Sequence, residues 1–266
     1  MLLIYCLIAG VLGALIAPRI SWAIRAWPGH EEFHCDYLDC PKCEPGLKRG
    51  CYNAGTFQDK CYLVFSVFVA ITSVYLFGFS LKAFISWLFT IACMVVTVTD
   101  IRYLIIPDRL SVTACWSGLL FAFVCMLWNT VFGFDKPSYY IEVVDSFIGF
   151  ACGGGFLWLL AWLAIVLLKK EGMGGGDIKL LAAFGAWTGW RTVVATVIIA
   201  SFLGTIGGVS SILYHKIKNG REYKPLTHMI PFGPYLCVGF LFIFFCGLEP
   251  LIKLFDAYQQ WLVGSI

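Results

Sequence analysis

The chain has 266 residues, of which 60% are hydrophobic, 17% are aromatic and 13% are charged, and its mean hydropathy is +0.82. This composition leaves too little polar surface to cover a soluble globular protein, so it predicts an integral membrane protein in contact with the lipid bilayer. The formal net charge is only +3, and we expect no nucleic acid among the partners. The positions of the basic residues therefore carry more information than their sum.

Eight apolar runs predict an all-α, polytopic protein with about eight transmembrane helices. In chain order they cover residues 2–24, 62–80, 83–99, 110–132, 141–168, 178–190, 192–214 and 231–254. The sixth run is shorter than the ~17 residues that a span usually needs, and the break at 188–191 predicts a close helical hairpin with the seventh. We expect a first transmembrane helix over 1–24, a cytoplasmic Cys-rich loop over 25–61 and a seven-helix membrane domain over 62–266.

The first run could be mistaken for a signal peptide, because both are apolar segments near an N-terminus. It has no basic residue before its apolar core, and Arg19 and Arg25 follow that core. A signal peptide has the opposite arrangement. We therefore interpret the run as a retained membrane anchor whose far end stays on the basic side.

The lysines and arginines predict the orientation of the chain in the membrane. The segments that follow runs one, three, five and seven carry Arg19, Arg25, Lys42, Lys48, Arg49, Lys60, Arg102, Arg109, Lys169, Lys170, Lys179, Lys216, Lys218, Arg221 and Lys224. The opposite segments carry Lys82, Lys136, Arg191 and Lys253. Basic residues are enriched on the cytoplasmic side, so the first group is predicted to be cytoplasmic and both termini are predicted to lie outside.

The predicted cytoplasmic loop contains a cluster of potential metal ligands. Cys40-Pro41-Lys42-Cys43 has the C-x-x-C spacing with which two thiolates share one tetrahedral zinc ion. Disulfides are the alternative, but a cytoplasmic loop is reducing. We predict a structural zinc ion bound by Cys40, Cys43, Cys51 and Cys61, with His34 or Cys35 as substitutes. Other cysteines, including Cys93 and Cys125, lie in apolar runs and are predicted to be packing residues.

Asp100 ends the third apolar run, and Pro107-Asp108 opens the fourth. For Asp108 we favour the ordinary interpretation of an N-cap that starts a helix after a proline. Asp100 could be an interfacial polar residue, but a carboxylate near a helix C-terminus opposes the helix dipole and is costly at the bilayer boundary. A role other than capping is therefore indicated for Asp100.

Asp177 precedes the sixth run and completes the pattern G-x-G-D in Gly174-Gly175-Gly176-Asp177. It could be a helix N-cap that follows a flexible glycine connector. However, the distribution of charge puts Asp177 on the same, cytoplasmic, face as Asp100. Two neighbouring carboxylates would hold one proton between them and so supply one acid and one base, as in aspartic proteases. Gly174 and Gly176 would let an extended substrate approach the backbone closely.

Three separated segments resemble the type IV prepilin peptidases. Residues 171–187 resemble the G-x-G-D segment of that family, and Asp100 with Ile106-Pro107-Asp108 resembles its first aspartate segment. The stretch Ile230-Pro231-Phe232-Gly233-Pro234-Tyr235-Leu236 resembles the segment that opens its last helix. The resemblance implies an eight-helix aspartyl endopeptidase of the bacterial inner membrane, with its active site facing the cytoplasm. Asp100 and Asp177 would be its catalytic aspartates, and Gly174, Gly176, Pro231 and Gly233 would lie in loops near the substrate.

The resemblance also implies the substrates. Enzymes of this family remove the short basic leader of type IV prepilins and pseudopilins, and bifunctional members then methylate the new N-terminus with S-adenosylmethionine. In this chain Cys51 and Cys61 do not form the second C-x-x-C pair that many members have. Methyl transfer, with S-adenosylmethionine as its cofactor, is therefore an open alternative to peptidase activity alone.

Two other functions share parts of this pattern. A G-x-G-D protease of the presenilin or signal-peptide-peptidase type would use the same carboxylates, but its first aspartate follows a tyrosine, whereas Thr99 precedes Asp100 here. A metal-ion transporter could use acidic residues and thiols, because carboxylates within membranes often mark ion paths. A transporter is expected to bind its ion near mid-membrane and often has an internal repeat, and the sequence has neither feature.

Overall fold

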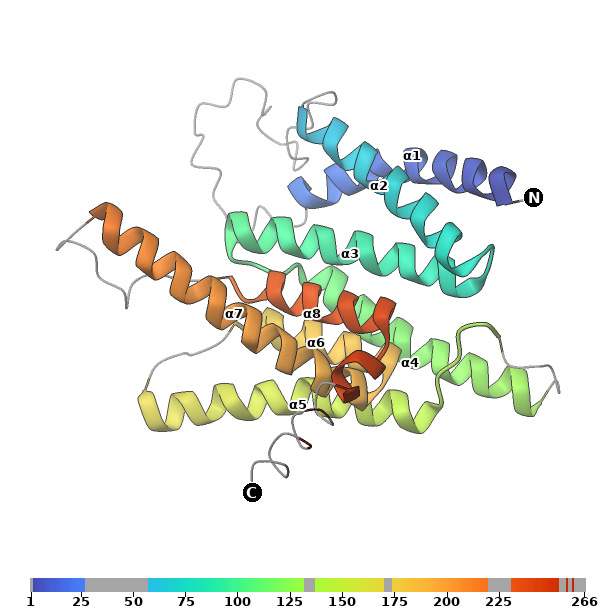
Figure 1. Cartoon of the computed structure of the whole chain (residues 1–266). Coiled ribbons are helices and arrows are strands. Elements are labelled where there is room, and N and C mark those ends of the chain that lie inside the picture. The colour runs from blue at the N-terminus through green and yellow to red at the C-terminus, as the bar shows by residue number, and fades with distance from the viewer. Residues whose placement is uncertain are drawn as a thin grey trace, which may run out of the picture. The chain divides into compact units, whose positions relative to one another are not determined.

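The structure is a computed structural model that covers residues 1–266 and describes residues 2–26, 57–131, 137–169, 174–219, 231–253, 257 and 260. In these ranges the long elements are all helical and no strand occurs (Figure 1). They are α1 (Leu2–Ala26), α2 (Phe57–Phe77), α3 (Leu81–Tyr103), α4 (Asp108–Thr130), α5 (Val143–Leu168), α6 (Gly175–Thr188), α7 (Trp190–Asn219) and α8 (Gly233–Cys246). The all-α prediction is confirmed for the part of the chain that is described.

Among the described helices, α1, α2, α3, α4, α5 and α7 are long and apolar enough to cross a membrane. Helices α6 and α8 have 14 residues each. At about 1.5 Å per residue such a helix is ~21 Å long, which is less than the ~30 Å of a hydrocarbon core. The prediction of a polytopic membrane protein is therefore confirmed, and the number of eight spans stays a prediction.

The ends of the apolar runs and of the helices differ by up to five residues, except that α8 ends at Cys246 instead of residue 254. The starts agree to within three residues, except at α2. This helix begins at Phe57 rather than at residue 62, so Lys60 and Cys61 lie in its first turns instead of in the predicted loop. Asp59 is in the first turn of α2, where the helix dipole favours a negative charge. This placement explains why polar residues extend the helix beyond the apolar run.

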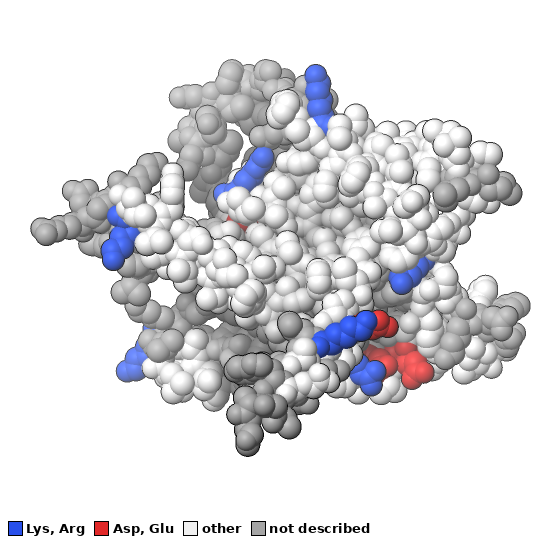
Figure 2. Space-filling model, viewed as in Figure 1, with Lys and Arg blue, Asp and Glu red and all other residues white. Residues whose placement is uncertain are grey.

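The chain divides into two compact units. The first unit comprises Met1–Leu110 with Trp128–Tyr140 and is built on α1, α2 and α3. The second comprises Ser111–Leu127 with Ile141–Ile266 and contains α5 to α8 with the middle of α4. Both units expose large apolar side chains such as Phe68, Trp116 and Phe202. Charged residues are sparse on the face drawn in Figure 2, as a lipid-covered surface requires.

In the first unit, α1 and α2 approach each other closely at Gly13. A Cβ atom at this position would lie only 2.9 Å from the carbonyl oxygen of Ser66. The buried hydroxyl of Ser66 donates a hydrogen bond of 2.9 Å to the carbonyl of Gly13. Small residues and interhelical hydrogen bonds of this kind hold helices together in membranes, where lipid is as apolar as the core. The unit is completed by a buried cluster that includes Ile24, Val69, Trp87 and Val95.

In the second unit, the short helix α6 is enclosed by longer neighbours. Its residues from Leu180 to Ala186 are buried without interruption. The indole of Trp187 at its end donates a hydrogen bond of 2.9 Å to the carbonyl of Ala114 in α4. The ring of Phe184 stacks on Phe240 of α8, with centroids 3.9 Å apart. Because α6 is apolar on all sides, it is stable only inside such a bundle.

Candidate active site

Asp100 lies in the last turn of α3, in the first unit, and only 6% of its surface is exposed. The helix ends three residues later at Tyr103, and its C-cap residue Leu104 adopts a left-handed conformation with φ of 55°. The backbone N–H of Leu104 donates a hydrogen bond of 2.9 Å to the carbonyl of Asp100. The expectation that Asp100 is a carboxylate at the C-terminal end of an apolar helix is therefore confirmed.

The turn that precedes Asp100 is rigid. Thr99 is fully buried, and its hydroxyl lies 3.0 Å from the carbonyl oxygens of both Val95 and Val96, to which it donates. A β-branched side chain in a helix has few rotamers, so these bonds fix Thr99 in one orientation. The following residue, Asp100, is thus attached to a backbone that is already ordered by packing and hydrogen bonds.

Asp177 lies in the first turn of α6, in the second unit, and is 9% exposed. Asp177 does not occupy the N-cap position that was considered for it, because α6 begins at Gly175 and Gly174 is the N-cap residue. The backbone N–H of Asp177 donates a 3.2 Å bond to the carbonyl of Gly174. Glycine is tolerated at an N-cap, and a carboxylate in the first turn is favourable to the helix dipole, so the helix can begin before Asp177.

The carboxylate of Asp177 folds back toward the start of its own helix. Its Oδ2 atom lies 3.6 Å from the position that a Cβ atom on Gly174 would occupy. The first N–H groups of a helix carry a partial positive charge, which favours the ionised form of a carboxyl group placed there. The backbone at Gly174 and Gly175 is exposed, and nothing lies within 4 Å of a Cβ atom built on Gly175. The structure therefore brings Asp177 and Gly174 together, next to open backbone.

Helix α5 holds α6 in place through glycines. Gly149 and Gly153 of α5 face the backbone of α6 so closely that added Cβ atoms would overlap the carbonyl oxygens of Gly185 and Leu181, respectively. The hydroxyl of Ser146 donates a hydrogen bond of 2.5 Å to the carbonyl of Ala186. Glycines four positions apart in an apolar helix are the usual means of close helix contact in membranes. Sequence reasoning missed this contact, although the spacing of these glycines was a signal that could have revealed it.

The Pro231–Gly233 segment leads into α8 and packs on α7. Gly233 is buried, and Phe232 is the residue before the first helical position. The ring of Phe232 lies 3.4 Å from a Cβ atom built on Gly204, and a Cβ atom on Gly207 would overlap the ring of Tyr235. Glycines on α7 thus make room for the aromatic residues that anchor this segment.

The predicted metal ligands are only partly described. Cys40, Cys43 and Cys51, with the substitutes His34 and Cys35, lie outside the described residues. Cys61 is an exposed, free cysteine on α2. The part of the chain that the structure describes contains no group of three His, Cys, Asp or Glu residues arranged to hold a metal ion.

The structure agrees with the predictions for two further cysteines. Cys93 and Cys125 are buried in α3 and α4, as expected for packing residues.

The predicted site residues are divided between the two units. Asp100 belongs to the first unit, whereas Asp177, Gly174, Gly176, Pro231 and Gly233 belong to the second. The pairing of the two carboxylates therefore stays a prediction.

The chain is similar to known proteins over most of its length. Residues 87–209, which include both aspartates, match the type IV leader peptidase family. The prepilin leader peptidase/N-methyltransferase of Pseudomonas aeruginosa is 32% identical over 236 residues, which cover 86% of this chain and 70% of that protein. Proteins of the same name are 33% identical in Aeromonas salmonicida, over 76% of this chain and 58% of the relative, and 35% identical in Escherichia coli, over 57% and 59%.

The chain spans little more than half the length of the Aeromonas and Escherichia relatives. No solved structure matches it. The similarity to the Pseudomonas protein nevertheless extends over more than two thirds of that relative, and the family match contains the G-x-G-D segment. This chain therefore belongs to the type IV leader peptidase family.

Proposed function

We propose that the protein is a membrane aspartyl endopeptidase that removes the basic leader peptide from type IV prepilins or pseudopilins. The observation that carries this proposal is the position of the two aspartates. Both lie within the matched residues 87–209, both are almost completely buried, and each is at an end of an apolar helix. A carboxylate is costly in such a position, so its presence there indicates a function.

The proposed reaction needs no covalent intermediate. One carboxylate takes a proton from a water molecule, which then attacks the carbonyl carbon of the scissile peptide bond. The protonated partner donates a hydrogen bond to the developing oxyanion and later supplies a proton to the leaving amine. Asp177, at the positive end of the α6 dipole, is suited to the ionised role at the start of the reaction, but a coupled pair titrates as a unit.

Membrane topology supplies the substrate preference in this proposal. The apolar helix of a prepilin stays in the bilayer, while its charged leader remains in the cytoplasm, so the bond at their junction reaches the membrane surface. The distribution of basic residues supports a cytoplasmic position for both aspartates. The exposed backbone at Gly174 and Gly175 would allow an extended substrate to approach Asp177 without a steric barrier.

The proposal is tested by incubating the full chain in detergent with a purified prepilin and measuring the released leader by mass spectrometry. Asp100→Asn and Asp177→Asn should each abolish cleavage. Asp145→Asn is the matched control, since Asp145 is an exposed aspartate in the first turn of α5, and it should cleave like the wild type. Full cleavage by Asp100→Asn or Asp177→Asn would refute the assignment of that residue.

We further propose a structural zinc ion bound by Cys40, Cys43, Cys51 and Cys61. Thiolates at C-x-x-C spacing support this ligand set, and the exposed thiol of Cys61 at the start of α2 is accessible to a metal ion. Such an ion would hold the loop in a defined shape and take no part in hydrolysis. Metal analysis of purified Cys40→Ser and Cys43→Ser variants should show lost zinc, and zinc retained at wild-type stoichiometry in both would contradict this ligand set.

Methyl transfer is tested in the same cleavage reaction. The relatives are named for both peptidase and N-methyltransferase activities. Labelled S-adenosylmethionine added during cleavage would transfer its methyl group to the new N-terminus if this chain is bifunctional. Cleavage without incorporation of label would assign peptidase activity alone.

A further inference from the structure

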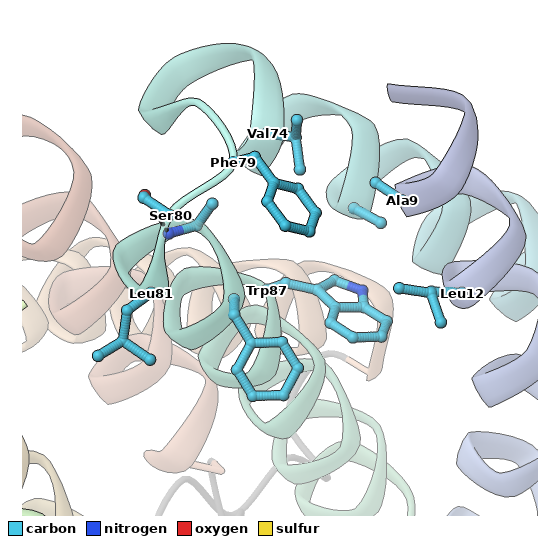
Figure 3. Close-up of a pocket in the computed structure, with 10 residues that line it drawn as sticks. Ala9, Leu12, Val74, Phe79, Ser80, Leu81 and Trp87 are labelled. Atoms are coloured by element: carbon cyan, nitrogen blue, oxygen red, sulfur yellow. Dashed lines mark hydrogen bonds between the residues drawn. The ribbon is translucent and has the colours of Figure 1, made fainter. Parts of the chain in front are cut away.

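An apolar cavity of about 410 Å³ lies in the first unit, where α1, α2 and α3 meet near the turn at residues 78–80. Its walls include Ala9 and Leu12 of α1, Val74 of α2, Phe79 of the turn, and Leu81 and Trp87 of α3 (Figure 3). Trp87 and Asp100 are on the same helix but about 20 Å apart along its axis. The cavity is therefore separate from the carboxylates that the proposed peptidase uses.

One polar group in the wall of this cavity lacks a partner. The side chain of Trp87 is 5% exposed, and among the described residues its Nε1 atom has no hydrogen-bond acceptor. Figure 3 shows the nitrogen edge of the indole turned toward Ala9 and Leu12, across the cavity. A buried N–H group without an acceptor is destabilising, so an acceptor that reaches it is favoured. The hydroxyl of Ser80, which also lines the cavity, is already bonded to the backbone of Phe77 and Ala83. The other walls are apolar, so a suitable occupant combines a hydrocarbon body with one acceptor oxygen.

The cavity lies near the end of two candidate membrane spans, as a site for the interfacial part of a lipid requires. Helices α2 and α3 are both candidate membrane spans, so the turn between them lies at a membrane surface. Trp87 is six residues into α3, which places it ~9 Å below the start of that helix. Tryptophan is enriched at this level of membrane proteins, where its N–H group meets polar lipid atoms.

The rim of the cavity is open, and a lysine neighbours two of its wall residues in the sequence. The wall residues Leu12, Phe79, Leu81 and Phe84 are all exposed, so the cavity is accessible from the surrounding lipid. Lys82 follows Leu81, and its Nζ atom lies 4.5 Å from the ring centroid of Phe77, at the end of α2. A lysine at this position can reach a headgroup phosphate while its methylenes lie along the apolar surface.

We propose that this cavity binds one anionic glycerophospholipid. One acyl chain fills the space lined by α1, α2 and α3, an ester carbonyl accepts a hydrogen bond from the indole of Trp87, and the phosphate lies near Lys82. A phospholipid supplies all three features at once, and the bilayer presents it at high concentration to a cavity that opens sideways. The proposal does not depend on the peptidase assignment.

The experiment compares two phosphatidylglycerols with equal sixteen-carbon chains, one ester-linked and one ether-linked. The ether lipid lacks the carbonyl oxygens and is otherwise closely matched. Affinities are measured by native mass spectrometry of the full chain, released from detergent after titration with each lipid. The wild type should bind the ester lipid about 2- to 10-fold more tightly than the ether lipid, as expected for one hydrogen bond.

Two variants and a control localise the effect. Trp87→Phe keeps an aromatic ring in the wall but removes the donor, so it should bind both lipids equally, at the affinity of the wild type for the ether lipid. Ala9→Leu fills the cavity and should weaken both lipids. Trp116→Phe alters an exposed tryptophan of α4 outside the cavity and should behave like the wild type.

Several results would overturn the proposal. One is equal binding of the two lipids by the wild type, and another is an ester preference that survives in Trp87→Phe. Displacement of the lipid by a prepilin would assign the cavity to substrate instead. Trp87→Phe keeps an aromatic ring and introduces no larger side chain, so it remains informative even if Ala9→Leu fails to fold. Cleavage assays on the same samples test the peptidase proposal separately, so loss of the lipid preference and loss of peptidase activity can be distinguished.

Discussion

Replacement of Gly149 by alanine should separate α5 from α6 and destabilise the second unit. A Cβ atom at this position would lie 2.8 Å from the carbonyl carbons of Gly185 and Gly189, and would overlap the carbonyl oxygen of Gly185. Ordinary contacts of this type need about 3.4 Å or more, and the obstacles are backbone atoms that cannot rotate away. The two helices must therefore move apart, which typically costs about 1–3 kcal/mol in a packed interior.

The same helix offers a matched control, because nothing lies within 4 Å of a Cβ atom built on Gly155. Gly155→Ala should leave stability unchanged or raise it by up to ~1 kcal/mol, since alanine is the better helix former. Unfolding free energies can be measured for the wild type and both variants by titration with sodium dodecyl sulfate in mixed micelles, with circular dichroism as the signal. If Gly149→Ala were as stable as Gly155→Ala, the close packing of α5 on α6 would be refuted.

Two other contacts of the second unit give predictions for the same assay. Phe240→Ala removes a fully buried ring that stacks on Phe184. It should lower the free energy of unfolding by about 3 kcal/mol, near the low end for such truncations because lipid is as apolar as the core. A decrease below ~1 kcal/mol would contradict the stacking. Ser146→Ala removes the hydrogen bond to Ala186 and should cost about 0.5–1.5 kcal/mol. Ser210→Ala is the control, because Ser210 is exposed and bonds within its own helix. It should change stability by less than ~0.5 kcal/mol. Equal effects of the two serine substitutions would contradict an interhelical role for Ser146.

The helices could be predicted closely from the sequence because membrane spans leave a strong one-dimensional signal. Each span is a run of apolar residues ended by charges, glycines or prolines, and the bilayer sets the minimum length of that run. The start of α2 was predicted incorrectly because Asp59 and Lys60 end the apolar run without ending the helix. Hydropathy reports which residues can lie in lipid, whereas helix ends are set by backbone hydrogen bonds and capping.

The sequence was sufficient to select candidate site residues, which stay a prediction, but not to predict their local geometry. Asp100 and Asp177 could be chosen because carboxylates at the ends of apolar runs need an explanation. The N-cap position considered for Asp177 lies at Gly174 instead, and Asp177 is in the first turn of α6. Asp is favoured both at the N-cap and in the first turn of a helix, so the sequence alone does not distinguish the two positions. The contacts made by Gly149 and Gly153 depend on which helices are neighbours, and that pairing is a tertiary property that single-helix patterns do not contain.

Single-turnover cleavage of a prepilin by Asp100→Asn, Asp177→Asn and the double variant tests most directly whether two carboxylates act as one catalytic pair. If they share the acid and base roles, each single substitution should remove nearly all activity, and the double variant should be no slower than either one, because groups that act as a unit are not additive. A double variant whose loss equals the product of two moderate single losses would contradict the pair. So would a single variant that cleaves at the wild-type rate.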